Sequence, residues 1–211
     1  MSPVKKEGKH ASRRAISIAR AGAELFSSKG YLETSMDDIA GAVRLSKGGL
    51  YHYFQSKTEL LAYILFGFMD VVLENLEAYL ETPGDSMEKI KNLVFRHVAI
   101  YATHVYAAKT LLNEAHSLPP KDFKKIKEKE RAYYEAVARV LADSLGPSIP
   151  KEEVTAITFT LLGMCNWIYS WYNPKGPINP EQLSQIIFDI LTVGIRGLQA
   201  KRAEDGKTGG V

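Results

Sequence analysis

Residues 34–61 read TSMDDIAGAVRLSKGGLYHYFQSKTELL, and this stretch decides the fold of the first part of the chain. A serine precedes each of three runs of helix-forming residues, namely Ser35, Ser46 and Ser56. A serine at this place accepts a hydrogen bond from an amide of the first helical turn and so favours a helix start. Apolar residues behind the first two serines recur at helical spacing. The stretch therefore predicts two short helices, from Met36 and from Lys47 to about Phe54, joined by a tight turn at 44–45.

The remainder of the chain is also helical in its periodicity. Turn residues divide it at Gly30, Pro83–Gly84, Pro119–Pro120, Gly146–Pro147 and 173–177. Between them we expect helices at about 57–76, 86–115 with a break near 103–106, 121–144, 151–172 and 180–201. We predict an all-α fold of about nine helices: a three-helix domain over residues 1–57, a second helical domain over 58–203 and a disordered tail over 204–211.

Composition excludes several classes of protein. The chain has 211 residues, of which 45% are hydrophobic and 24% are charged, as in ordinary globular proteins. No apolar run approaches the length of a transmembrane helix, and the basic start from Met1 to His10 is followed by no apolar segment of a secretory signal. Cys165 is the only cysteine, so an intrachain disulfide is excluded and a cytoplasmic location is expected.

Charge is distributed unevenly along the sequence. Residues 1–57 hold ten Lys and Arg against five Asp and Glu, whereas the rest holds 17 basic and 19 acidic residues. A basic first quarter on a slightly acidic body indicates a polyanionic partner for the first part alone. An ordinary solvated basic surface is the alternative.

The second short helix has the properties of a helix that enters a DNA groove. It begins with small or hydrogen-bonding residues, Ser46-Lys47-Gly48-Gly49, although each glycine costs a helix about 1 kcal/mol relative to alanine. Close approach of the backbone to DNA is a reason for that cost. Tyr51, His52 and Tyr53 can donate to phosphates or base edges, and Lys57 stands at the start of the next helix. These features predict a helix-turn-helix that binds double-stranded DNA.

This region resembles the TetR family of transcriptional regulators. The matching text is AGAELFSSKGY at 21–31, TSMDDIAGAV at 34–43 and LSKGGLYHYFQSKTELL at 45–61. The resemblance implies DNA contacts from Thr34, Ser35, Arg44, Lys47, Gly48, Tyr51, His52 and Lys57; Ser46, Gly49 and Tyr53 complete the predicted surface. Gly49 departs from the family, which often has a larger side chain there, so we expect fewer direct contacts between side chains and bases. Ile39, Leu50 and Phe54 are predicted core.

A single reading helix contacts only a few base pairs, so specific binding calls for a homodimer on a palindrome. The last helix is apolar on more than one side and needs burial beyond its own fold. The predicted dimer residues are Trp171, Phe188, Leu191, Ile195 and Leu198, with Ile186, Ile187, Ile190 and Val193 widening the surface. The family resemblance implies the same contact, made by the last two helices of each subunit.

The body of the chain offers residues for a small hydrophobic effector. The predicted set is Phe66, Met69, His97, Tyr101, His104, Phe159, Asn166 and Trp167. Asn166 is the most telling, because an amide inside an apolar run needs a polar partner if it is buried. Ordinary core packing is the alternative for the aromatic residues. His97 and His104 lack a third ligand nearby in sequence, so no metal is expected.

The segment GMCNWIYSWYNPKGPINPEQL at 163–183 resembles the TetR regulators that respond to acyl-CoA thioesters. Together these features predict a repressor released by such an effector, without cofactor or membrane. An activator with the same reading helix stays open as an alternative. A helical acyl-CoA carrier or enzyme is a further alternative, although the sequence holds no nucleophile elbow, phosphate loop or dinucleotide motif, and His97 with Glu114 is its best acid–base pair.

Overall fold

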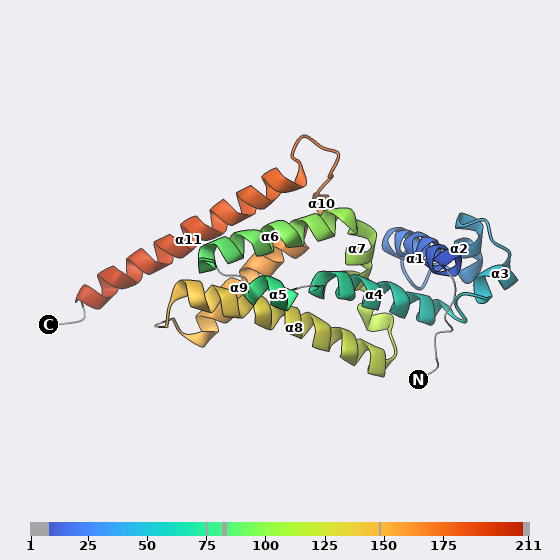
Figure 1. The fold of residues 1–211 in the computed structure, drawn as a ribbon, viewed down its shortest axis with the longest axis horizontal. Coiled ribbons are helices and arrows are strands. Elements are labelled where there is room, and N and C mark those ends of the chain that lie inside the picture. Colours follow the sequence, from blue (N-terminus) through green and yellow to red (C-terminus); the bar gives the residue numbers. More distant parts are fainter. Residues whose placement is uncertain (1–8, 75, 82–83, 148, 209–211) are drawn as a thin grey trace. The chain divides into compact units, whose positions relative to one another are not determined.

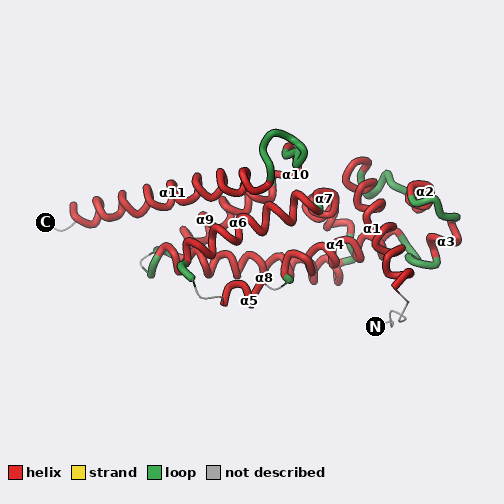
Figure 2. The backbone as a smooth tube through the Cα atoms, turned by 45° about the horizontal axis from the view of Figure 1, so that its top comes forward, coloured by secondary structure: helices red, strands yellow, loops and turns green. Residues whose placement is uncertain are grey.

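The computed structural model describes residues 9–74, 76–81, 84–147 and 149–208, and within these ranges the chain forms helices and loops with no strand (Figures 1 and 2). The helices are α1 Lys9–Lys29, α2 Met36–Ala42, α3 Lys47–Tyr51, α4 Lys57–Leu73, α5 Leu76–Glu81, α6 Ser86–Thr103, α7 Val105–Glu114, η1 Ala115–Ser117, α8 Pro120–Leu145, α9 Lys151–Asn166, α10 Ile168–Trp171 and α11 Pro180–Thr208. None of the described helices is both long enough and apolar enough to cross a membrane.

The all-α fold class is confirmed, with differences at the helix ends. The helix expected over 57–76 ends at Leu73, and the one expected over 151–172 divides into α9 and α10 around Trp167. α3 stops at Tyr51 instead of Phe54, because the chain turns at 52–53. Residues 204–208, predicted as disordered tail, continue α11, since extending an existing helix avoids the cost of nucleating a new one. Residues 209–211 of that tail lie outside the described residues.

The chain divides into two compact units. Unit 1 comprises residues 1–71 and 104–129, and unit 2 comprises residues 72–103 and 130–211. Helix α8 contributes its first part to unit 1 and the rest to unit 2. The boundary predicted between residues 57 and 58 falls inside unit 1, at the first turn of α4.

Unit 1 is built around α1. This helix packs against α2 and α7, and the buried hydroxyl of Thr110 on α7 donates to the Tyr106 carbonyl at 2.7 Å and lies 3.3 Å from the Ala23 carbonyl of α1. Burial of apolar side chains is the main contribution to its stability. Ile39 and Leu50 are fully buried and Phe54 nearly so, which confirms the three predicted core residues.

Unit 2 is organised by α6, which packs against α11, α9 and α10. Val94 and Val98 of α6, Leu161 of α9 and Ile195 of α11 are all buried in its core. Only one stripe of α11 enters this core, because a straight helix that packs on one neighbour buries one side.

Candidate functional site

The first turn of α2 is fixed by a capping box. The Ser35 hydroxyl accepts a hydrogen bond from the Asp38 amide at 3.0 Å, and the Asp38 carboxylate accepts one from the Ser35 amide at 2.8 Å. The Asp38 carboxylate also accepts hydrogen bonds from the Ser35 hydroxyl and the Lys29 ammonium. Together with the bond from the Ser35 amide, which has the largest effect, they lower the pKa of Asp38 from 3.8 to about 2. The reciprocal bonds satisfy amides that would otherwise lack partners at the start of the helix.

The turn between α2 and α3 is held by the backbone. Arg44 adopts the left-handed conformation with φ of 52°, and the Leu45 amide donates to the Ala40 carbonyl at 2.9 Å. Ser46 then caps α3 by accepting from the Gly49 amide at 3.1 Å. The predicted caps at Ser35 and Ser46 are thus confirmed, and α2 and α3 pack against each other as a helix-turn-helix.

The two glycines of α3 lie in different surroundings. A Cβ atom at Gly48 would meet nothing within 4 Å, whereas one at Gly49 would lie 3.2 Å from the Ser46 hydroxyl oxygen. The cap geometry therefore gives Gly49 a structural reason within the chain itself. Gly48 has none, so the interpretation that glycine permits close backbone approach to DNA rests on Gly48 alone.

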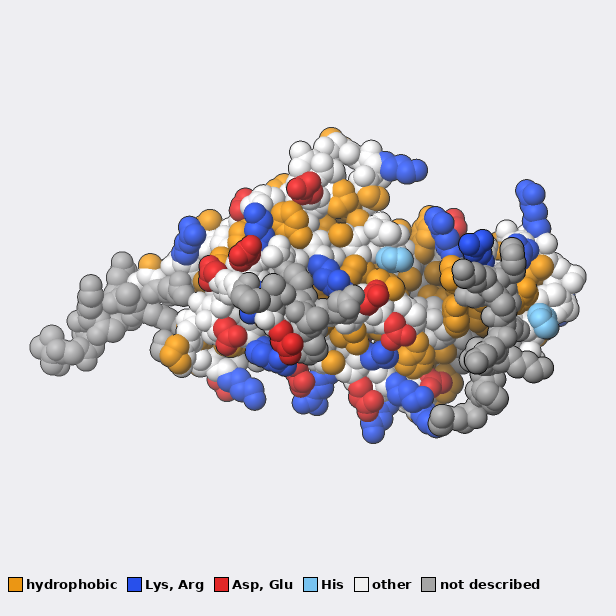
Figure 3. Space-filling model, in the orientation of Figure 1, with side chains coloured by type: hydrophobic (Ala, Val, Ile, Leu, Met, Phe, Trp, Pro, Cys, Tyr) orange, Lys and Arg blue, Asp and Glu red, His pale blue; other side chains and the backbone are white. Residues whose placement is uncertain are grey.

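Several predicted DNA-contacting residues form an accessible polar surface. Those exposed are Ser35, Arg44, Ser46, Lys47, Gly48 and His52, and those half-buried are Gly49, Tyr51 and Tyr53. Lys47 forms an exposed ion pair with Asp37 at 3.1 Å, which contributes little to stability and leaves the ammonium accessible. In the view of Figure 3, Lys and Arg side chains project over α1 and α2. That this surface binds DNA remains a prediction.

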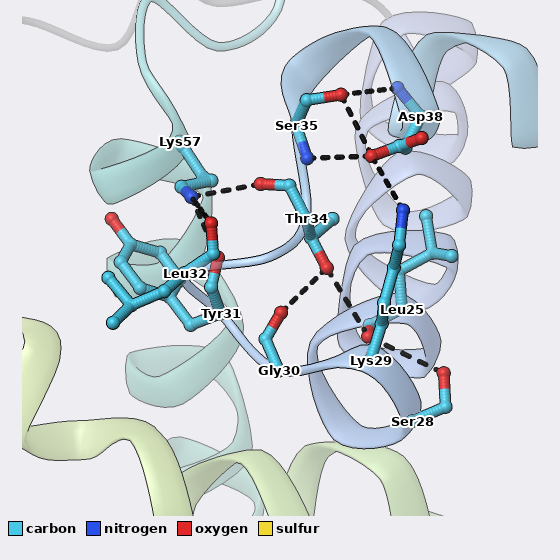
Figure 4. Close-up of polar contacts among 10 residues, drawn as sticks. All are labelled: Leu25, Ser28, Lys29, Gly30, Tyr31, Leu32, Thr34, Ser35, Asp38 and Lys57. Carbon is cyan, nitrogen blue, oxygen red and sulfur yellow. Dashed lines mark hydrogen bonds and ion pairs between the residues drawn. The ribbon is translucent and has the colours of Figure 1, made fainter.

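Thr34 and Lys57 differ from these residues, because both side chains form contacts within unit 1. Thr34 is buried, and its hydroxyl donates to the Gly30 carbonyl at 2.7 Å (Figure 4). The Lys57 ammonium donates to the carbonyls of the α1–α2 turn at Tyr31, Leu32 and Thr34. Sequence reasoning missed this because the three carbonyls meet only once the turn has formed.

Several large apolar side chains of unit 2 are exposed on α9, α10 and α11 and at the junction between α9 and α10. We call these side chains together the α9–α11 face; they are Phe159, Trp167, Trp171, Ile186, Ile190, Val193 and Leu198. Four of them recur on α11 near helical spacing, and α11 contacts α9. A surface with this many exposed large apolar side chains is typical of a protein contact.

Two of the predicted dimer residues are corrected by this arrangement. Leu191 and Ile195 are buried in unit 2, where α11 packs against α6, and Phe188 is half-buried beneath the Lys91 ammonium. Trp171 and Leu198 are exposed as expected. The sequence could not separate the two stripes, because both sides of α11 are apolar.

A buried polar cluster lies at the centre of unit 2. His97 of α6 stacks on Tyr101 with ring centroids 4.2 Å apart, and its Nδ1 is 2.9 Å from the hydroxyl of Tyr133 on α8. Burial lowers the pKa of His97 to about 4, against a smaller raising effect of its polar contact with Asn166. Within the described residues, the buried Nε2 of His97 has no hydrogen-bond partner. The cluster therefore holds a neutral imidazole with one unsatisfied polar atom.

The predicted effector residues do not all join this cluster. His97, Tyr101 and Asn166 do, and Tyr133 is a member that the sequence reasoning missed. His104 does not join the cluster, because it lies beyond the end of α6 at Thr103 and belongs to unit 1. Phe159 and Trp167 lie exposed on the α9–α11 face, and unit 1 contains Phe66 and the buried Met69.

A separate open cavity of about 1000 Å³ lies in unit 2 between α8 and α9. Its lining includes the cations Arg131, Arg139 and Lys151 together with Glu135 and Asp143. Arg131 is paired with Glu135 at 2.8 Å, so this lining is mixed in charge. Among the described residues, no group of three or more His, Cys, Asp or Glu side chains is placed to hold a metal ion.

Comparison with known families and structures agrees with this architecture. The bacterial regulatory protein model of the tetR family matches residues 18–64, and the tetracyclin repressor-like C-terminal domain model matches residues 83–195. The helix-turn-helix and the helical body thus define a DNA-binding transcriptional regulator. The chain belongs to the TetR family.

Individual relatives are similar over nearly the whole chain. The transcriptional repressor KstR2 of Mycolicibacterium smegmatis is 26% identical over 91% of this chain and 95% of its own. A TetR-family regulator from Bordetella parapertussis has a TM-score of 0.80 at 28% identity, over 84% of this chain and 93% of that one. AibR, solved in complex with isovaleryl coenzyme A and operator DNA, has a TM-score of 0.73 at 25% identity, over 84% and 97% of the two chains.

Proposed function

We propose that this regulator is a repressor that binds a palindromic operator as a homodimer and is released by an acyl-CoA thioester. The observation that best supports DNA binding is the exposed first turn of α3. Ser46 is used as its cap, while Lys47 and Gly48 present a cation and an open backbone beside the exposed Arg44. Such a turn can enter the major groove and contact phosphates and base edges.

The α9–α11 face supports the homodimer. Ile190 and Val193 are 59% and 69% exposed on α11, and Trp167 is 62% exposed just after α9. A second copy of the same face would bury these side chains about a two-fold axis, as in most homodimers. The two reading helices would then contact successive major grooves, which lie about 34 Å apart.

Two observations support an acyl-CoA effector. AibR, whose structure contains isovaleryl coenzyme A together with operator DNA, is similar to this chain over most of its length. The cluster of His97, Tyr133 and Asn166 also leaves the buried Nε2 of His97 without a hydrogen-bond partner among the described residues. A carbonyl oxygen of an acyl thioester is a group that a neutral imidazole can recognise by a hydrogen bond.

The test uses purified protein and the DNA upstream of its own gene. We expect fluorescence anisotropy to show tighter binding to this DNA than to a random duplex, and footprinting to show two protected half-sites. Acyl-CoAs of graded chain length should raise the melting temperature, since a ligand of the folded state stabilises it by mass action, and should release the DNA. Equal affinity for both duplexes would exclude the repressor, and acyl-CoAs that neither stabilise the protein nor release the DNA would exclude the effector.

A further inference from the structure

The ammonium of Lys57 is completely occupied inside unit 1. It donates to the carbonyl oxygens of Tyr31 at 2.7 Å, Leu32 at 3.2 Å and Thr34 at 2.9 Å (Figure 4). A lysine ammonium has three N–H donors, so these three bonds use all of them. The ring of Tyr31 lies 4.4 Å from the same nitrogen and adds a cation–π contact.

The carbonyls that bind Lys57 belong to a turn that is itself fixed. Gly30 ends α1 in the left-handed conformation with φ of +97°, which reverses the chain. The Thr34 hydroxyl then donates to the Gly30 carbonyl, and the Tyr31 hydroxyl is 2.9 Å from that of Thr58 on α4. These contacts turn the backbone carbonyls of 31–34 toward the first turn of α4, where Lys57 lies.

We infer that Lys57 is a positioning residue for DNA recognition and not a ligand of DNA phosphate. It attaches the α1–α2 turn to the start of α4, and through Ser35 this turn carries α2, against which the reading helix α3 packs. A phosphate could bind the ammonium only by displacing one of three carbonyls. Lys47 is exposed and pairs with Asp37 at the surface, so its charge is available to phosphate.

Arginine separates these two roles for residue 57. An Arg keeps the positive charge and binds phosphate well, but its flat guanidinium cannot direct three N–H groups onto carbonyls that converge on a single nitrogen. A phosphate ligand would therefore tolerate Lys57→Arg. A positioning residue would not tolerate it, and Lys57→Met, which keeps the length of the side chain without its charge, should then have the same effect.

The experiment measures the affinity of the full-length protein for a random-sequence duplex as a function of salt. The inference rests on the proposed DNA binding, and a wild-type protein that fails to bind any duplex would refute that proposal instead. The measurements are made at a temperature at which circular dichroism shows each variant fully folded. Loss of one phosphate contact lowers the slope of log K against log salt by about 0.9, or about 1.8 for both subunits of a dimer.

We expect Lys57→Met and Lys57→Arg to leave this slope unchanged while weakening binding roughly tenfold, equivalent to one lost hydrogen bond to a charged group. Both should also melt on the order of 5 °C lower than the wild type. Lys47→Ala, the matched control, should reduce the slope and leave the melting temperature unchanged. The inference is overturned if Lys57→Met reduces the slope as Lys47→Ala does, or if Lys57→Arg retains wild-type affinity and melting temperature. The affinity and melting temperature of Lys57→Arg, which retains the charge, therefore test the inference even if Lys57→Met does not fold.

Discussion

The buried His97 should make the stability of this protein depend on pH in a defined window. Burial lowers its pKa from 6.5 to about 4 in the folded chain. The unfolded chain therefore takes up a proton at a higher pH than the folded chain does. The stability associated with neutral His97 is fully present above about pH 6.5 and is lost as the pH falls toward 4, where the folded form is finally protonated.

The size of this effect follows from the two pKa values. One pKa unit corresponds to about 1.4 kcal/mol, so the free energy of unfolding should fall by roughly 2 kcal/mol at pH 5 and by about 3 kcal/mol near pH 4. This loss belongs to His97 alone and adds to that of other groups. We propose His97→Gln to isolate it, because glutamine retains hydrogen-bonding capacity beside Tyr133 and does not titrate.

The assay is urea unfolding followed by circular dichroism at pH 7.5, 6 and 5, at one protein concentration. The difference in unfolding free energy between wild type and His97→Gln should shift by roughly 2 kcal/mol between pH 7.5 and pH 5, in the direction that favours the variant at low pH. Tyr133→Phe is the matched control, since it removes the 2.9 Å contact of the hydroxyl with Nδ1 but retains the imidazole. A difference between wild type and His97→Gln that is constant over the whole pH range would refute the reasoning.

Three further outcomes are expected. Gly48→Ala should raise the melting temperature, because the added Cβ meets nothing within 4 Å and alanine favours the helix by about 1 kcal/mol; a DNA affinity unchanged by it would argue against close backbone approach. Ile190→Glu should leave helicity intact but give monomers in sedimentation, since a carboxylate would be buried at the contact between subunits, whereas Arg196→Ala on the same helix should remain dimeric. Arg44→Gly should stabilise the chain by about 1 kcal/mol in urea unfolding by relieving the left-handed φ of 52°, and should weaken DNA binding if the guanidinium contacts phosphate.

The features that could be predicted from the sequence are those set by neighbouring residues. The caps at Ser35 and Ser46 depend on amides three residues further along the chain, so the local sequence was sufficient to place them. The core positions Ile39 and Leu50 followed from helical spacing in the same way. The role of Lys57 depends on carbonyls 23 to 26 residues away, and no pattern near Lys57 indicates that they converge there.

Helix α11 is a second case in which the local sequence was not sufficient for the prediction. Its apolar residues form two stripes, and sequence periodicity cannot decide which stripe faces inward when both are apolar. Packing against α6 decides it by burying Leu191 and Ile195 and leaving Ile190 and Val193 exposed. The predicted dimer surface therefore mixed the two stripes: Leu191 and Ile195 are buried, whereas Ile190 and Val193 of the same predicted surface are exposed.

This division of α11 links the proposed effector cluster to the proposed dimer surface within unit 2. His97 lies on α6, and α6 packs against the inward stripe of α11, whose other side is the α9–α11 face. A ligand that hydrogen-bonds to Nε2 of His97 would favour whichever placement of α6 makes that bond best. It can change the spacing of the two reading helices only if its affinity differs between the two arrangements of the dimer. His97→Gln should therefore reduce release of DNA by the effector more strongly than it reduces DNA binding itself.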